Sequence, residues 1–132
     1  MAAGIEWGFE TYPEYMDAVD GLPKGINYSG YVGHSALRTY VMGERAFSDA
    51  ASEDDVRNMQ QLVKQAVQAG AIGFSTSRTF NHLTADDRPV ASRIAEWDEV
   101  RAIVNAVGET GKGLFEIAGE APGRDPERIA EY

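Results

Sequence analysis

The chain of 132 residues contains no cysteine, and this absence removes disulfide bonds, thiolate metal sites and a cysteine nucleophile together. Basic residues are scarce as well, because 12 lysines and arginines stand against 21 acidic residues, which gives a formal net charge of −9. No segment of the sequence clusters basic side chains. Nucleic acid and anionic membrane surfaces are therefore poor partners for this chain.

Long hydrophobic runs are missing too. No stretch approaches the ~18 consecutive apolar residues of a membrane-spanning helix, and the first twenty residues contain several acids but no basic segment of the kind that begins a signal peptide. Neither a membrane span nor a secretion signal is predicted, and a cytoplasmic protein is the default expectation. The hydrophobic content of 43% suffices for the core of one domain, expected over residues 1–132.

Capping signals and amphipathic patterns predict helices. The pairs Thr11 with Glu14 and Ser52 with Asp55 have the spacing of capping boxes. The expected helices run from Thr11 to about residue 22, from Ser52 to about 69, from about 96 to 110, and onward from Asp125. The segment 39–51 shows no usable pattern.

Three short apolar segments between these helices predict strands, at residues 26–32, 71–75 and 114–118. The segment 71–75 lacks polar alternation, as expected of a strand covered on both faces. Strands and helices alternate at intervals of roughly 40 to 45 residues, which is the rhythm of right-handed βαβ crossovers. The fold class is therefore predicted to be α/β with a parallel sheet. A long loop is expected from about 77 to 95, and polar residues gather where the strands end, the edge at which α/β folds place their chemistry.

Five polar residues near the strand ends are candidate substrate-binding residues: His34, Arg38, Ser75, His82 and Glu116. His34 and Arg38 could contact a substrate, or they could be a buried hydrogen-bonded histidine and a salt-bridged arginine. His82 could equally be a solvated loop residue, while Glu116 either faces a polar barrel interior or pairs with a cation. No G-x-S-x-G elbow surrounds Ser75, which argues against a serine hydrolase, and His82 has no metal-ligand spacing to the other histidine.

Two motifs, VGHSALR at 32–38 and AGAIGFSTSR at 69–78, resemble the N-acyl-D-amino-acid deacylase (D-aminoacylase) branch of the amidohydrolase superfamily. The resemblance extends from about residue 6 to 116. It implies that the chain is an internal fragment of a (β/α)8 TIM barrel, contributing about three βα units, strands three to five. It also implies a zinc-dependent parent enzyme whose small-molecule substrate is an N-acylated amino acid, cleaved at its linear C–N (amide) bond.

The same resemblance indicates what the chain does not carry. The family's metal ligands after the first, second and eighth strands would lie outside this sequence, and Ala118 stands where the fifth strand of the family ends in a metal-binding histidine. No catalytic residue can therefore be carried over, and the chain is expected to hold no zinc and to be inactive in isolation. Two open sheet edges predict marginal stability and offer a route to self-association.

Two other hypotheses come from different classes. The chain could be a non-catalytic open α/β module that binds a small anionic ligand or a partner subunit, or a translated remnant of a degraded gene without function. Stoichiometric metal binding would favour the enzyme, and a stable monomer indifferent to chelators would favour the module. Intact or broken codons upstream for the missing strand would identify the remnant.

Overall fold

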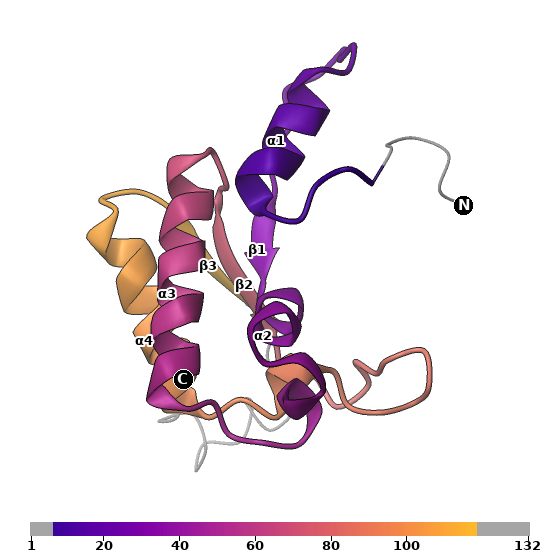
Figure 1. Cartoon of the computed structure of the whole chain (residues 1–132), viewed down its shortest axis with the longest axis vertical. Coiled ribbons are helices and arrows are strands. Elements are labelled where there is room, and N and C mark those ends of the chain that lie inside the picture. The colour runs from indigo at the N-terminus through magenta and orange to yellow at the C-terminus, as the bar shows by residue number, and fades with distance from the viewer. Residues whose placement is uncertain (1–6, 119–132) are drawn as a thin grey trace.

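Helices and strands alternate along residues 7–118, the part of the chain that the structure, a computed structural model, describes (Figure 1). In chain order the elements are α1 (Tyr12–Asp20), β1 (Tyr31–Gly33), α2 (His34–Met42), η1 (Gly43–Phe47), α3 (Glu53–Gln68), β2 (Gly73–Ser77), η2 (Ala91–Arg93), α4 (Trp97–Glu109) and β3 (Leu114–Ala118). The predicted α/β class is confirmed, because the strands form one parallel sheet in the order β1-β2-β3. Across the described residues, no helix has the length and apolarity needed to cross a membrane. The helix expected from Asp125 lies outside the described residues.

Both predicted capping boxes are present. The Thr11 hydroxyl accepts a hydrogen bond from the backbone N–H of Glu14, whose carboxylate accepts in return from the Thr11 N–H at 2.9 Å. Pro13 lies in the first turn of α1. Ser52 and Asp55 exchange the same pair of bonds at the start of α3. These local contacts satisfy N–H groups that a first helical turn leaves unpaired, which is why both helix starts were predictable.

Two strands begin later than their apolar segments predicted: β1 at 31–33 instead of 26–32, and β2 at 73–77 instead of 71–75. Pairing sets these bounds. Tyr31 lies opposite Gly73, and Gly73 lies opposite Leu114, so each strand begins where its neighbour can pair with it. Ile26 precedes that point and is 80% exposed, so its β propensity is not used. β3 lies where it was expected.

Segment 39–51, which shows no usable pattern in the sequence, contains the end of α2 and the whole of η1. The buried side of α2 carries His34 and Arg38 beside Leu37 and Met42. Two polar residues within the inward stripe disguise the helical period of the apolar residues, and this explains why the pattern gave no helix.

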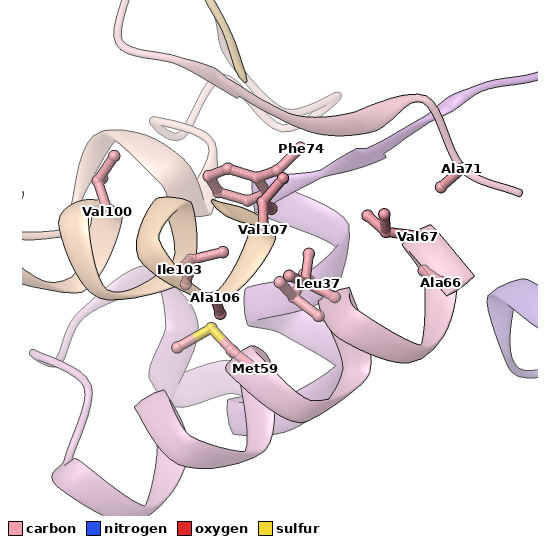
Figure 2. Packing of buried hydrophobic residues seen from close by; sticks show 11 residues of the cluster. Leu37, Met59, Ala66, Val67, Ala71, Phe74, Val100, Ile103, Ala106 and Val107 are labelled. Carbon is pink, nitrogen blue, oxygen red and sulfur yellow. The ribbon is translucent and has the colours of Figure 1, made fainter. Parts of the chain in front are cut away.

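The apolar core lies between the sheet and the helices α2, α3 and α4 (Figure 2). The cluster consists of Leu37, Met59, Val63, Ala66, Val67, Ala71, Phe74, Val100, Ile103, Ala106 and Val107. Phe74 points from β2 into this layer and is fully buried. Because side chains alternate along a strand, Ser75 lies on the opposite face, where it is only half-buried beside the exposed Glu116 of β3. One face of β2 is therefore buried and the other half-buried, whereas the sequence predicted a strand covered on both faces.

Glycine permits two features of this sheet. Gly70 has a φ of +116°, in the region that favours glycine, and it allows the chain to leave α3 for β2. Gly73 allows a close approach between neighbouring strands, because a Cβ atom at this position would lie 1.9 Å from the Leu114 carbonyl oxygen. The pairing of β2 with β3 thus requires glycine at its first residue.

Candidate functional site

A pocket of about 370 Å³ lies at the carboxyl ends of the three strands, since its wall includes Gly33, Ser77 and Ala118, the last residue of each strand. Four of the five predicted candidates line it: His34, Ser75, His82 and Glu116. The expectation that polar residues gather at this end of the sheet is met for these four, while Arg38 lies behind the wall. The geometry of each residue shows which of them face the open space.

His34 is the first residue of α2, directly after β1, and its side chain is fully buried. Its Nε2 lies 2.8 Å from Oε1 of Glu99, and its Nδ1 lies 2.8 Å from Oγ1 of Thr76. Phe74 packs edge-on against the imidazole, with the ring centroids 5.1 Å apart. The ring thereby connects the ends of β1 and β2 to α4. These contacts are those of a buried, hydrogen-bonded histidine, which was the alternative to a substrate contact for this residue.

Arg38 is also fully buried, on the same side of α2. Its Nε donates to both carboxylate oxygens of Glu99, at 3.0 and 3.3 Å. Its two terminal nitrogens donate to the backbone carbonyls of Ala46, of Asp49 at 2.6 Å, and of Ala91 at 3.5 Å. The guanidinium is thus salt-bridged to an acid, as the structural alternative expected, and it also holds backbone from two separate segments.

Glu99 and Thr76 complete this buried group, and the sequence analysis singled out neither. Glu99 lies on the inward face of α4 together with Val100 and Ile103. An acid on an otherwise apolar helix face was the available signal, since a buried carboxylate needs a cation or a donor beside it. Thr76 lies on the helix-facing side of β2, as Phe74 does, where a buried hydroxyl needs a hydrogen-bond partner.

Three serines connect the long loop after β2 to the pocket wall. Ser92 is buried in η2, and its hydroxyl donates to the Ser77 carbonyl at 2.7 Å. The Ser35 hydroxyl donates to Ser92 Oγ at 2.9 Å and accepts from the Ser92 N–H at 3.1 Å. Sequence reasoning predicted the loop between 77 and 95 but not that Ser92 anchors it to the ends of β2 and of α2.

Ser75, His82 and Glu116 lie on the more open side of the pocket. Ser75 is half-buried and lies opposite Glu116 in the ladder between β2 and β3. Glu116 is exposed and lines the pocket, which agrees with the polar-interior alternative for this residue. His82 is exposed on the loop, as its solvated alternative predicts, and it also contributes to the pocket wall.

Comparison with known proteins shows which proteins this chain is similar to. No protein-family model matches the sequence. An uncharacterized protein of Mycobacterium tuberculosis is 34% identical over 113 residues, which cover 80% of this chain and 18% of that protein. The D-aminoacylase of Alcaligenes xylosoxydans xylosoxydans is 37% identical over 73 residues, which cover 55% of this chain and 15% of the enzyme. A crystal structure of D-aminoacylase, which defines a novel subset of amidohydrolases, matches 80% of this chain with a TM-score of 0.62 and 30% identity.

The resemblance to the D-aminoacylases is confirmed. The chain spans about a fifth of the length of these relatives, because the matched regions cover 18% of the mycobacterial protein and 20% of the D-aminoacylase structure. The similarity also supports a fold that corresponds to part of the D-aminoacylase structure.

A further solved structure concerns the binuclear metal centre of D-aminoacylase, so the donor groups of this chain can be tested against such a centre. Within residues 7–118, no group of three or more histidine, aspartate and glutamate side chains could hold a metal ion. His34 and Glu99 are buried together, but they are bound to each other, and a cation between them would meet the guanidinium of Arg38. The described residues by themselves do not supply the donor set of a metal centre.

Proposed function

We propose that this chain forms strands three to five of an amidohydrolase-type (β/α)8 barrel, and that the complete protein hydrolyses the amide bond of an N-acylated amino acid. The observation that supports this most is the joint match of sequence and fold to D-aminoacylase over 80% of the chain, at 30% identity. Two further relatives are an N-acyl-D-aspartate deacylase and an N-acyl-D-glutamate deacylase, each 35% identical over about half of the chain. N-acyl-D-amino acids are therefore the substrate class of the proposal.

In this proposal the pocket at the strand ends is one wall of the substrate site. Ser75 and His82 offer hydrogen-bonding groups there, and the Glu116 carboxylate is an acceptor for an amide N–H of the substrate. Because residues 7–118 by themselves do not supply a metal centre, the proposal gives them substrate contacts. Without the metal site, the chain by itself is inactive.

The alternative is a module that binds a small anionic ligand. Glu116 places a carboxylate in the pocket, and the chain carries a net charge of −9. Both features repel an anion, but they do not separate the two proposals, because an N-acyl-D-amino acid also carries a carboxylate. A module that binds a partner subunit through its open sheet edges would share the fold, so the solution state of the chain must distinguish it.

The test combines size-exclusion chromatography, circular dichroism and a deacylase assay on the purified chain. We expect self-association, a melt that zinc does not shift, and no hydrolysis of N-acetyl-D-methionine or N-acetyl-D-glutamate. Hydrolysis by the chain alone would contradict its inactivity. A monodisperse monomer with a cooperative melt would instead favour the binding module.

A pair of variants locates the self-association. Leu114 is 60% exposed on β3, an edge strand of the described sheet, so Leu114→Lys should shift the chain towards the monomer by charging that edge. Tyr40→Lys is the matched control, since Tyr40 is 58% exposed and lies on α2 rather than on β3. Equal effects of the two substitutions would show that association does not use the β3 edge.

A further inference from the structure

We propose that His34, Arg38 and Glu99 are positioning residues, which hold the wall of the pocket in place and lock the His34 ring in its neutral tautomer with the proton on Nε2. The proposal rests on the proposed function in taking the pocket to be a substrate site. The hydrogen bonds of the three residues do not depend on that function. It explains why three ionisable side chains are buried at the strand ends of this chain.

The tautomer follows from the two partners of the ring. Glu99 Oε1 lies 2.8 Å from Nε2 and, as part of a carboxylate, can only accept, so Nε2 carries a proton. Thr76 Oγ1 lies 2.8 Å from Nδ1, and a threonine hydroxyl can donate to an unprotonated nitrogen. With Nδ1 as acceptor, the neutral ring protonated on Nε2 makes both of these hydrogen bonds.

Charge balance supports the same assignment. The Glu99 carboxylate is shared between His34 and Arg38, and all three side chains are almost completely inaccessible to water. Arg38 already neutralises this single carboxylate. A second positive charge on His34 would remain uncompensated in a buried site, where an unpaired charge is strongly destabilising.

Arg38 transmits the position of α2 to two distant segments. Glu99 orients the guanidinium through Nε, which leaves the terminal nitrogens to hold the carbonyls of Ala46 in η1, of Asp49 just beyond it, and of Ala91 in η2. A lysine carries the same charge but a single nitrogen, and it cannot reproduce this planar set of donors. The buried cation therefore acts as a connection between η1 and η2.

The connection continues from η2 to the pocket. Ser92 follows Ala91 and contacts both Ser35 and Ser77, and these three serines line the pocket. A buried ion pair adds little net stability compared with an apolar replacement, so its value lies in fixing geometry. Movement of η2 would displace Ser92, and with it the hydroxyl groups on this side of the pocket.

The tautomer is tested by long-range proton–nitrogen correlation spectra of the nitrogen-labelled chain. His34 and His82 are the two histidines of the sequence, so His82→Gln assigns the signals. We expect a protonated Nε2 and an unprotonated Nδ1 for His34. A proton on Nδ1, or shifts that average as for a free imidazole, would overturn the assignment.

The isosteric variant Thr76→Val and the conservative variant Thr76→Ser sharpen this test without changing any charge. Thr76→Val removes the donor to Nδ1 and should change the nitrogen shifts of His34, whereas Thr76→Ser should restore them. Identical His34 spectra in all three proteins would show that Thr76 does not set the tautomer.

The positioning role is tested by amide hydrogen exchange in Arg38→Lys, with Arg57→Lys as a control because Arg57 pairs with Glu53 and Asp54 on the exposed side of α3. In Arg38→Lys we expect exchange about tenfold faster in segments 43–51 and 90–93, with the centres of α3 and α4 unchanged. Arg57→Lys should leave both segments as they are. Equal acceleration throughout the chain would indicate general destabilisation and overturn the proposal. None of these readouts requires turnover, so they distinguish this proposal from failure of the proposed function.

Discussion

The two faces of the sheet have opposite properties, and the contrast is visible within one strand. Phe74 is fully buried on the helix side, in one cluster with Val63 and Ile103. Ser75, the next residue, lies half-buried on the other side, opposite the exposed Glu116. The helix side therefore supplies the free energy that orders the chain, while the other side carries the polar groups of the candidate site. Stability and site can be altered separately by residues one position apart.

The largest expected change in stability distinguishes the two faces of the sheet directly. Phe74→Ala should lower the free energy of unfolding by about 3–5 kcal/mol, because it leaves a cavity in the core. Ser75→Ala, on the other face, should change it by less than about 0.5 kcal/mol. Urea unfolding followed by far-ultraviolet circular dichroism measures both. Similar losses for the two variants would contradict the contrast between the faces.

The next largest loss of stability is expected when a methyl group is added between β2 and β3. Gly73→Ala places a Cβ atom 1.9 Å from the Leu114 carbonyl oxygen, so the backbones of β2 and β3 must separate. Overpacking of this kind costs about 1–3 kcal/mol. Faster amide exchange in β3 than in α3 would place the damage in the sheet, and unchanged exchange in β3 would refute the close approach.

Removal of a helix cap should lower the free energy of unfolding by a smaller amount. Ser52→Ala deletes the hydroxyl that accepts from the Asp55 N–H, and such a loss is worth about 1 kcal/mol. Ser52→Thr retains the oxygen and should recover most of the stability. If alanine and threonine had the same effect in urea unfolding, the side-chain cap would not be the cause.

A smaller effect should appear at acid pH. The Arg45 guanidinium, at 3.0 Å, holds the pKa of Asp55 below its usual value, and hydrogen bonds from Ser52 act in the same direction. The stabilisation is fully present above the unfolded-state pKa of about 3.9 and is lost as the pH falls through the lower folded-state pKa. The stability difference between the unmodified chain and Asp55→Asn should therefore shrink below about pH 4. A difference that stays constant from pH 6 to 3 would contradict this.

The smallest change in stability is expected on the open face. Glu116→Leu should alter the free energy of unfolding by less than about 0.5 kcal/mol, because the side chain is exposed. The same substitution should increase self-association in size-exclusion chromatography by extending the exposed apolar surface beside Leu114. A large loss of stability would show that the carboxylate is engaged within the fold.

The candidate site was only partly predictable. His34 and Arg38 drew attention because they follow a strand, but their shared partner Glu99 did not. Glu99 lies 65 residues from His34 and 61 from Arg38 in the sequence. A pairing over such a distance depends on how the intervening helices and strands pack, and a short sequence pattern does not contain that information.

Local chemistry in the sequence by itself determined the starts of α1 and α3, the apolar faces of α3 and α4, and the alternation that implies a parallel sheet. Capping boxes and helical periods involve residues three or four apart, so tertiary contacts need not be known. Only the tertiary structure decided the bounds of β1 and β2, the existence of α2, and the burial of Arg38 against Glu99. Each of these depends on a neighbour far along the chain, because pairing and burial are satisfied in space rather than in sequence.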